Sequence, residues 1–264
     1  MERATLLGRL AQPARLDWRA ARVVAARQET PRVRTLVLEV PDWPGHSAGQ
    51  HLDLRLTAED GYQAQRSFSI ASAPGEPHIE VTVERLSDGE VSPYLTDVIE
   101  EGDLLDVRGP IGGYFVWNPQ PSRPLALIGG GCGIAPLMCM LRHRASVAAD
   151  APSAVPPARL LYSARSADER IYRAELDGLA ESDKDLRINY TFTRSPPVGW
   201  SGYRRRLDRE MLEEVFWPTA AEPIFYVCGP TLMVETGATL LAELGYPPTD
   251  ILTERFGPTG ESGP

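Results

Sequence analysis

Stretches in which apolar and polar residues alternate dominate the first half of the chain. The alternation is clearest in residues 34–40, 51–56 and 79–84. A period of two residues turns one set of side chains into a core and the other toward the surface, which is typical of a half-buried β-strand. Turn signals such as Asp60-Gly61 separate these runs at short intervals. The sequence therefore predicts an antiparallel β-barrel in this half.

The pattern changes after a proline-rich joint at residues 118–124. Short apolar runs then alternate with helical segments, which indicates a parallel sheet with crossover helices. The predicted strands are 125–128, 159–162, 186–192, 224–227 and 250–253, and the predicted helices are 136–144, 173–179, 208–215 and 232–244. The fold class is therefore an antiparallel β-barrel domain followed by a parallel-sheet, Rossmann-like α/β domain.

The chain divides into three predicted parts. Residues 1–16 form an N-terminal arm or short helix, residues 17–118 the β-barrel domain, and residues 119–264 the α/β domain. Apolar residues within 91–99 share one helical face, so we expect a short helix to interrupt the barrel there. The alanine- and proline-rich stretch 148–157 is predicted to be a surface loop.

Composition narrows the possible functions. The chain has 264 residues, of which 42% are hydrophobic and 24% charged, and this suits a globular protein with two cores. A formal net charge of -9 argues against nucleic-acid binding, which needs a basic face. The sequence contains no run approaching the roughly 18 apolar residues of a membrane-spanning helix, and its first residues do not resemble a signal peptide. We expect a cytoplasmic protein.

Cysteine usage points away from metal chemistry. Cys132, Cys139 and Cys228 are odd in number and widely scattered. They match neither a disulfide framework nor the clustered spacing of a zinc or iron–sulfur site. We expect three free thiols and no protein-bound metal.

Two motifs have the groups that hold a nucleotide. The glycine-rich segment 129–136 lies between an apolar strand and a helix, so backbone N–H groups and the helix dipole would face an anion. A glycine turn that serves only tight packing is the alternative. The segment 66–69 offers an arginine, an aromatic ring and two hydroxyls at the end of a strand-like run. Two phosphate-holding sites in one chain suggest two nucleotides, with electrons passed between them.

The order of motifs resembles that of the ferredoxin–NADP reductase superfamily, from about residue 23 to residue 257. The motifs that carry the resemblance are Arg-x-x-Ser at 66–69, Gly-x-x-Ser at 89–92, Gly-Gly-Gly-x-Gly-Ile-x-Pro at 129–136, Tyr-Ser-x-Arg at 162–165, Cys-Gly-Pro at 228–230 and Glu-x-Phe at 254–256. The resemblance implies a flavin domain followed by a pyridine-nucleotide domain.

For the flavin, the resemblance implies that Arg66 pairs with the pyrophosphate, that the Phe68 ring packs on the isoalloxazine, and that Ser69 bonds near flavin N5. A guanidinium suits phosphate oxygens and an aromatic face suits a planar ring. The remaining candidate flavin contacts are Ser67, Val83, Arg85, Gly89, Val91 and Ser92. Ser92 taken alone is equally an ordinary helix cap. FAD is favoured over FMN.

For the pyridine nucleotide, the resemblance implies that the glycine loop binds the pyrophosphate through Gly131, Gly133, Ile134 and Pro136. Arg165, Thr193, Arg194 and Arg204 follow strands at the carboxyl edge of the predicted sheet, where open α/β sheets bind ligands. Arginines there suit the 2′-phosphate of NADPH, and residues 191–207 contain no carboxylate of the kind that binds the NAD ribose. A solvated surface run is the other interpretation of the arginines. NADP(H) is preferred and NAD(H) stays open.

Four residues are the candidate catalytic groups. By resemblance, Cys228 lies with Gly229 and Pro230 beside the nicotinamide and tunes its approach without acting as a nucleophile. A buried thiol with only a packing role is the alternative. Glu254 is the candidate for proton or charge handling, and Phe256 for covering the flavin face. Ser69 completes the set.

The resemblance implies an NAD(P)H-dependent flavoprotein reductase, in which hydride passes to FAD and electrons leave to an acceptor. Because the chain lacks a cysteine cluster of its own, the acceptor is expected to be separate, as a ferredoxin or an oxygenase partner. A reductase of small diffusible acceptors and a non-catalytic flavin-binding redox module are the alternatives.

Overall fold

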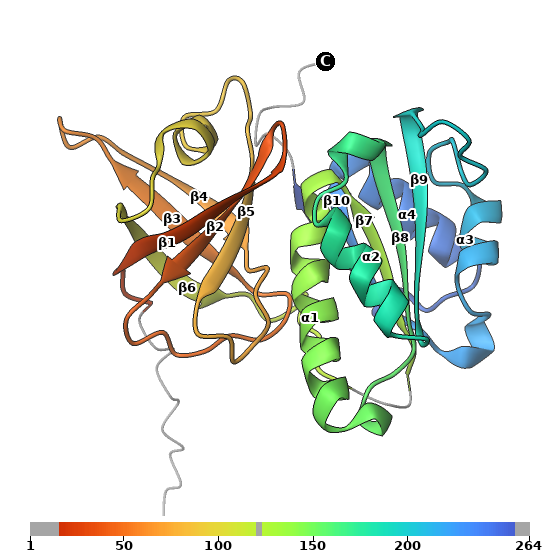
Figure 1. Cartoon of the computed structure of the whole chain (residues 1–264). Coiled ribbons are helices and arrows are strands. Elements are labelled where there is room, and N and C mark those ends of the chain that lie inside the picture. The colour runs from red at the N-terminus through yellow and green to blue at the C-terminus, as the bar shows by residue number, and fades with distance from the viewer. Residues whose placement is uncertain (1–15, 120–122, 257–264) are drawn as a thin grey trace, which may run out of the picture.

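Two sheets lie side by side in the computed structural model, which describes residues 16–119 and 123–256 (Figure 1). The first sheet has six strands and the second has five. The predicted fold class is confirmed. The predicted arm falls on residues 1–16, of which all but the last lie outside the described residues. The predicted domain boundaries stay predictions, and we name the two parts after their sheets, the antiparallel domain and the parallel domain.

The antiparallel domain is a twisted six-stranded sheet with the order β4-β3-β6-β1-β2-β5. Its strands are β1 (Arg19–Thr30), β2 (Val33–Glu39), β3 (His51–Thr57), β4 (Gln63–Ser69), β5 (Ile79–Glu84) and β6 (Leu104–Ile111). The three runs with clear alternation became β2, β3 and β5. In β1 the periodicity is obscured because alanines occupy both buried and less buried positions and a register shift interrupts the pairing after Val23.

The segment predicted to be a short helix forms one π-helical turn at Tyr94–Val98. Leu95 is its buried residue and packs into the core of the antiparallel domain together with Val91 and Ile99. The apolar periodicity was therefore meaningful, but the regular helical part is shorter than the pattern suggested.

The parallel domain has the strand order β11-β10-β7-β8-β9. Its strands are β7 (Leu125–Gly130), β8 (Ala158–Ser166), β9 (Leu186–Ser195), β10 (Ile224–Pro230) and β11 (Ile251–Phe256). Its α-helices are α1 (Ile134–Asp150), α2 (Arg173–Ser182), α3 (Arg209–Val215) and α4 (Thr231–Glu243). Short 3-10 turns lie at Gly131–Gly133, Pro152–Ala154, Ala167–Glu169, Thr219–Ala221 and Pro248–Asp250.

Alternate residues of β7 pack on opposite faces of this sheet. Leu125 and Leu127 belong to the core on the side of α1 and α2, whereas Ala126 and Ile128 belong to the core on the side of α3 and α4. A strand buried on both faces needs apolar residues at every position, which explains its continuous apolar run. Every predicted strand and helix of this half forms, and the largest difference in bounds is at α1, which ends six residues later than expected. The predicted loop at 148–157 is partly helical, because α1 continues to Asp150.

The two domains share a continuous apolar core. Phe115 and Trp117, at the end of the antiparallel domain, join the same buried cluster as Leu137 and Met140 of α1. Figure 1 shows α1 as the element of the parallel domain that faces the other sheet. The predicted free thiols are confirmed for all three cysteines. Within residues 16–119 and 123–256, no helix is long and apolar enough to cross a membrane.

Candidate functional site

The glycine loop and the Cys-Gly-Pro motif, almost a hundred residues apart in the sequence, are in contact at the carboxyl edge of the parallel sheet. A Cβ atom placed on Gly133 would lie 2.2 Å from the carbonyl oxygen of Cys228. Only a glycine permits this approach, because a side chain would collide with the backbone of β10. Gly131 has a φ of 53°, a left-handed conformation that glycine adopts without strain. The two motifs therefore form one surface.

The loop leads directly into α1 and leaves the start of this helix open. Among the described residues, no side chain caps its N-terminus. Ile134 and Pro136 are buried in the first turn, the N–H of Ile134 already donates to carbonyls of the loop, and Pro136 has no N–H, so neither offers a ligand a free donor. The hydroxyl of Tyr162 donates to the carbonyl of Gly131 at 3.3 Å and holds the loop from below. The free N–H groups and the helix dipole suit a phosphate.

Cys228 and Glu254 are paired in the register of β10 and β11, and Pro230 is paired with Phe256 two positions later. The Cys228 side chain is fully buried, and burial raises the pKa of its thiol well above the usual value. This thiol is neutral, which agrees with the expectation that it is no nucleophile. Phe256 is half-buried and packs on the shared core.

Burial also raises the pKa of the Glu254 carboxyl to about 7. Its Oε2 atom is buried and has no hydrogen-bond partner among the described residues. A carboxyl group in this environment changes its protonation near neutral pH, which is the property of a group that exchanges protons with a ligand.

Ser69 is the second predicted catalytic residue with an unsatisfied polar atom. It ends β4, its side chain is buried, and its Oγ has no partner among the described residues. Buried hydroxyls are nearly always hydrogen-bonded in folded proteins. The hydroxyl is therefore available to a bound group, and this is the observation that best fits a flavin on the antiparallel domain.

The other residues of the Arg-x-x-Ser motif differ in whether their side chains are free to contact a ligand. The Arg66 side chain is 54% exposed and lies 3.8 Å from Glu90, a loose ion pair. Phe68 is half-buried against the core of its domain. Ser67 donates its hydroxyl to Asp53 at 2.7 Å, and Arg108 donates to the same carboxylate. Arg66 is thus free to bind an anion, whereas the Ser67 hydroxyl is already engaged.

The Gly-x-x-Ser motif forms a closed turn. Ser92 Oγ accepts from the N–H of Leu86 at 3.0 Å, and the N–H of Gly89 donates to the carbonyl of Leu86. Ser92 therefore stabilises the turn and does not cap the helical turn that follows. Arg85 extends toward solvent and pairs with Asp97 at 2.7 Å. The side chains of Val83 and Val91 are buried in the core, so these two residues present only backbone groups.

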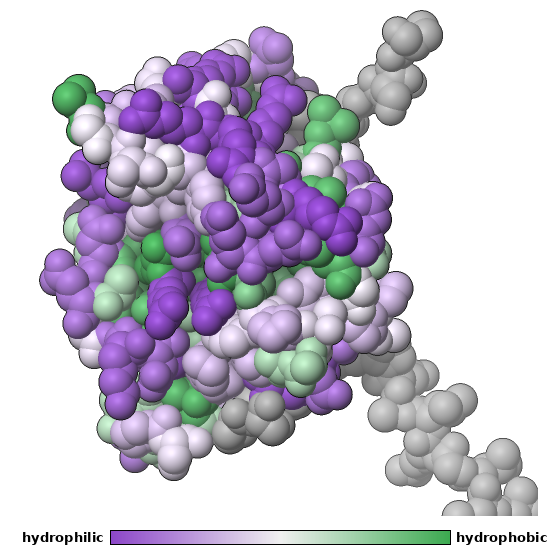
Figure 2. Space-filling model, turned by 90° about the vertical axis from the view of Figure 1, so that its right-hand side faces the viewer, coloured by the Kyte–Doolittle hydropathy of each residue, from purple (hydrophilic) through white to green (hydrophobic). Residues whose placement is uncertain are grey.

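The arginines expected to bind the 2′-phosphate are not equivalent. Arg165 and Arg194 are exposed at the ends of β8 and β9, and the hydroxyl of Thr193 in β9 donates to the carbonyl of Ala164 in β8 at 3.5 Å. Arg204 donates to the carbonyl of Trp200. Figure 2 shows the side of the molecule that carries α3 and the loop after β9, with hydrophilic residues prevailing in its upper half.

Carboxylates of α3 and of the residue before it pair with side chains of the loop that follows β9. Arg205 pairs with Asp208 and with Glu210, the latter at 2.9 Å, and the Tyr203 hydroxyl donates to Glu214 at 2.6 Å. The sequence segment 191–207 has no acidic residue, but the fold brings three to it from further along the chain. Arg205 is consequently neutralised, whereas Arg194 and Arg204 keep their charge available.

Met233 is a site residue that the sequence did not reveal. A Cβ atom on Gly130 would lie 2.4 Å from the Met233 sulfur, and one on Gly229 would lie 2.7 Å from its methyl carbon. Met233 thus covers both glycine-containing strand ends from the first turn of α4. A methionine at the start of an amphipathic helix is usually a core residue, so nothing in the sequence distinguished it.

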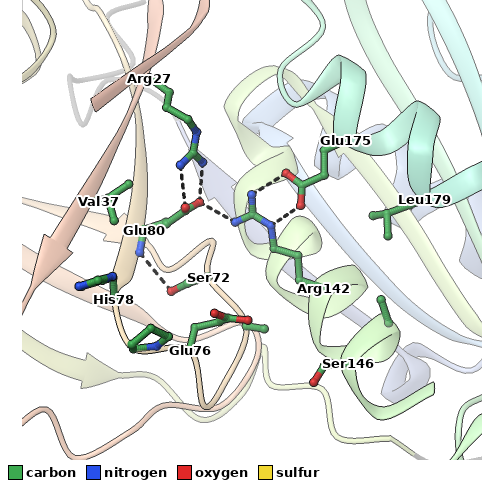
Figure 3. A pocket seen from close by; sticks show the side chains of 13 residues that line it. Arg27, Val37, Ser72, Glu76, His78, Glu80, Arg142, Ser146, Glu175 and Leu179 are labelled. Carbon is green, nitrogen blue, oxygen red and sulfur yellow. Dashed lines mark hydrogen bonds and ion pairs between the residues drawn. The ribbon is translucent and has the colours of Figure 1, made fainter. Parts of the chain in front are cut away.

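An open cleft of about 700 Å³ lies elsewhere, between β5 and α1, and is lined by Arg27, Glu80, Arg142 and Glu175 among others (Figure 3). It contains none of the predicted cofactor residues. The candidate site is therefore the surface at the carboxyl edge of the parallel sheet, together with the end of β4.

Comparisons with known proteins agree with this arrangement. Residues 20–116 match the family model of the oxidoreductase FAD-binding domain, and residues 127–238 match that of the oxidoreductase NAD-binding domain. Ferredoxin–NADP reductase B of Sorangium cellulosum is 35% identical over 245 residues, which cover 89% of this chain and 96% of that protein.

Two further similarities concern larger systems. The glycine betaine monooxygenase reductase subunit of Chromohalobacter salexigens is 31% identical over 243 residues, which cover 90% of this chain but 64% of the relative. The FAD/NAD-binding domain of a nitric oxide dioxygenase from Vibrio cholerae has the same fold, with a TM-score of 0.77 and 25% identity over 91% of this chain and 99% of that structure. With its FAD-binding and NAD-binding domains in this order, the chain belongs to the ferredoxin–NADP reductase family of oxidoreductases.

Proposed function

We propose that this protein is an NAD(P)H-dependent reductase that binds FAD on the antiparallel domain and passes electrons to a separate acceptor. One observation carries the proposal: the glycine loop, Cys228 and Glu254 meet at one sheet edge, where a titratable carboxyl remains unsatisfied. Bound FAD would accept a hydride from the pyridine nucleotide and release its electrons one at a time, chemistry that side chains cannot perform.

The residues that would hold FAD contribute different chemical groups to different parts of the cofactor. Arg66 and Arg85 supply positive charge for the pyrophosphate, Phe68 supplies an aromatic face, and Ser69 donates its unsatisfied hydroxyl to the ring system. The turn that contains Gly89 and Ser92 offers backbone N–H groups. Ser67 of β4 and Val83 of β5 support these residues from the strands, and Val91 supports them from the segment before the π-helical turn.

The pyridine nucleotide would lie on the parallel domain. Its pyrophosphate would be bound by the N–H groups of the loop Gly131–Gly133, which the N–H of Ile134 holds in shape by donating to carbonyls of the loop. Cys228 with Gly229 and Pro230 would form the wall beside the nicotinamide. Glu254 exchanges a proton at its carboxyl, since its pKa of about 7 allows both protonation states near neutral pH. Phe256 covers the ring face until the nicotinamide enters.

NADPH is the preferred electron donor. Arg194 and Arg204 are exposed near the end of β9, where the 2′-phosphate would lie. The charge of the neighbouring Arg205 is already neutralised by Asp208. A phosphate oxygen gains a charge-assisted hydrogen bond from a guanidinium, whereas the hydroxyl of NADH gains less. NADH is the second candidate.

The acceptor is proposed to be a ferredoxin or an oxygenase component. The printed names of relatives, a ferredoxin–NADP reductase and monooxygenase reductase subunits, support a protein acceptor. Small diffusible acceptors are the alternative, and a non-catalytic flavin module would be indicated by bound flavin that no pyridine nucleotide reduces. The cytoplasmic location stays a prediction.

The test is an anaerobic absorption spectrum of the purified protein before and after NADPH, with NADH in a second cuvette. Loss of a flavin band near roughly 450 nm, faster with NADPH, is the expected result. A protein that remains colourless after FAD is supplied would overturn the cofactor assignments.

A further inference from the structure

Arg142 on α1 joins three separate parts of the molecule. Its Nη1 donates to the carbonyl of Ala71 at 2.9 Å and to Glu80 at 2.7 Å, and its Nε and Nη2 each donate to Glu175 at 2.7 Å. The side chain is only 15% exposed. Figure 3 shows its guanidinium between Glu80 of β5 on one side and Glu175 of α2 on the other. Two of these contacts cross between the domains and the third stays within the parallel domain.

Glu80 is itself fixed from the antiparallel side. Arg27 donates to both of its carboxylate oxygens at 2.9 Å. Burial opposes the charge of Glu80, but hydrogen bonds and charge from Arg27 and Arg142 outweigh it, so the pKa of the carboxyl is lowered. A charge-assisted pair with good geometry and little solvent is stronger than an exposed surface pair. The Glu80 carboxylate therefore gives Arg142 a rigid anchor.

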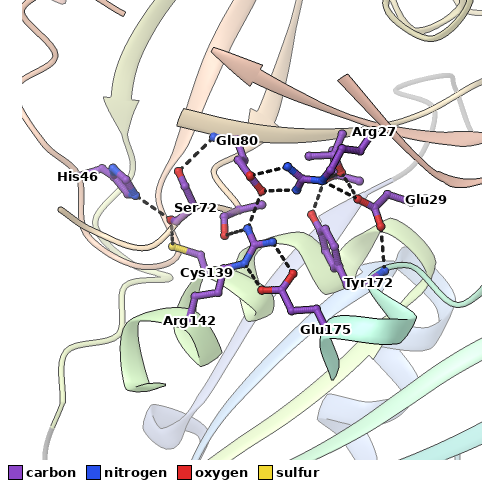
Figure 4. A network of polar contacts seen from close by, with 12 residues as sticks. Arg27, Glu29, His46, Ser72, Glu80, Cys139, Arg142, Tyr172 and Glu175 are labelled. Carbon is purple, nitrogen blue, oxygen red and sulfur yellow. Dashed lines mark hydrogen bonds and ion pairs between the residues drawn. The ribbon is translucent and has the colours of Figure 1, made fainter. Parts of the chain in front are cut away.

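A second contact lies two residues further along the same face of β5. Thr82 and the hydroxyl of Tyr172 are hydrogen-bonded, and Thr82 also bonds to Thr35 at 2.8 Å. The backbone N–H of Tyr172 donates to Glu29 at 3.3 Å. Figure 4 shows this group continuous with Arg142, whose guanidinium carbon lies 5.2 Å from the centre of the Tyr172 ring.

Tyr172 adopts a φ of 58°, a left-handed conformation that is unusual for a tyrosine and costs about 1 kcal/mol or more. It immediately precedes α2. A residue whose backbone adopts this conformation while its hydroxyl and its N–H contact the other domain indicates that the fold favours a defined position of α2 against β5.

The network lies between the two halves of the candidate site. Ala71 follows Ser69 by two residues, and α1 begins at the glycine loop and reaches Arg142 two turns later. A change in the Arg142 contacts would consequently move the flavin-side residues relative to the nucleotide-side residues, with neither set directly altered.

We propose that Arg142 is a positioning residue that sets the separation between the end of β4 and the glycine loop, and thereby the approach of nicotinamide to flavin. This inference rests on the proposed function. Hydride transfer depends steeply on the distance between donor and acceptor, because a displacement of about 1 Å can cost about 100-fold in rate. Binding of each nucleotide separately does not depend on this distance.

The experiment compares five variants of the full chain, the fifth being Arg142→Lys. Arg142→Gln removes the guanidinium and with it the contacts to Ala71, Glu80 and Glu175. Glu80→Gln weakens the contact of Arg142 across the domains. Glu175→Gln weakens only the contact within the parallel domain. Arg209→Gln alters an exposed arginine that pairs with Glu213 within α3. Single-turnover reduction of bound flavin, the dissociation constants of FAD and NADP⁺, and hydrogen exchange of the backbone amides in 71–84 and 138–150 are measured for each.

Arg142→Gln and Glu80→Gln are expected to slow flavin reduction by at least about 10-fold, with both dissociation constants within about twofold of the wild type. Faster amide exchange on both sides of the domain contact should accompany the loss of rate. Glu175→Gln and Arg209→Gln should stay within about twofold throughout. Arg142→Lys keeps the charge without the planar fork, and partial recovery of the rate is expected.

Three results would overturn the inference. The first is a wild-type rate of flavin reduction in Arg142→Gln. The second is a loss of rate that is matched by weaker binding of both nucleotides, because a merely structural role of Arg142 predicts this result. If neither nucleotide reduces the wild-type flavin, the proposed function fails instead. In that case hydrogen exchange by itself tests whether Arg142 fixes the two domains against each other. Unchanged exchange in Arg142→Gln is the third result that would refute this role.

Discussion

Cys228 and Glu254 are direct partners in the register of β10 and β11, so that a thiol and a carboxyl share one buried environment at the carboxyl edge of the sheet. The register also brings the carbonyl of Cys228 against Gly133. Burial is the first cause of the raised pKa of both side chains, and for the thiol the nearby Glu254 carboxyl adds to it. The pair gives the site a neutral thiol and a carboxyl that titrates near neutral pH.

Glu254→Gln should change how stability depends on pH. In the unfolded chain the carboxyl loses its proton near pH 4.5, but in the fold only near pH 7. The stability associated with this group is therefore complete below about pH 4.5 and is lost as the pH rises to 7. Relative to the wild type, the variant should gain up to about 2 kcal/mol in free energy of unfolding between pH 5 and pH 8, measured by denaturant titration.

The same variant has a kinetic consequence. If Glu254 exchanges the proton, the rate of wild-type turnover should change with pH around 7, and this change should disappear in Glu254→Gln. An identical pH profile in both proteins would exclude Glu254 as the titrating group. Glu235→Gln, which alters an exposed carboxylate paired with Arg255, is the matched control.

Ser69→Ala should affect flavin chemistry more than folding. Because the buried Oγ has no protein partner among the described residues, its removal costs less than about 1 kcal/mol of stability. Loss of a hydrogen bond to the bound flavin should slow its reduction about 2- to 10-fold. Thermal unfolding and stopped-flow reduction separate the two effects, and a large fall in the unfolding temperature with normal reduction would contradict the assignment.

Arg66→Ala should weaken retention of FAD. The side chain is exposed and only loosely paired with Glu90, so little folding energy is lost with it. A charge-assisted bond to phosphate is worth about 1.5–3 kcal/mol, which predicts a rise of about 10- to 100-fold in the FAD dissociation constant. Fluorescence titration of FAD measures this rise. Arg209→Ala, at another exposed and paired arginine, should leave the constant unchanged.

Arg204→Ala and Arg205→Ala should differ although the residues are adjacent. Arg205 is already paired with Asp208 and Glu210, whereas Arg204 contacts only a backbone carbonyl among the described residues. Arg204→Ala is expected to raise the KM for NADPH about 10-fold with little effect on that for NADH. Steady-state kinetics with both nucleotides test this. Equal effects of the two substitutions would show that the run acts only as surface charge.

Much of the parallel domain could be predicted because its local signals agree with its packing. The run Leu125 to Ile128 is apolar at every position, and the structure buries both faces of this strand. The glycine loop that follows was equally clear, since its four glycines and the following proline are typical of a tight turn that leads into a helix. Strand ends were placed less well: β8 extends four residues and β9 three residues further, into polar segments that pairing between the two strands makes regular.

Other features depended on segments distant in the sequence. No local pattern showed that acidic groups of α3 would neutralise Arg205, or that Met233 would cover two glycines. The unsatisfied state of Ser69 and Glu254 is likewise a property of the packing around them. Residue type and spacing identified candidate groups, but which of them are free to bind a ligand depended on their neighbours in space.

Strand β5 shows most clearly where the sequence was sufficient and where it was not. The alternation from Ile79 to Glu84 determined that this segment is a strand with one apolar and one polar face, because successive side chains point to opposite sides. The pattern predicted that the polar face meets solvent. The tertiary structure instead placed Arg142 and Tyr172 against Glu80 and Thr82. Periodicity depends on backbone geometry within one segment, whereas the partner of a polar face depends on how distant segments pack.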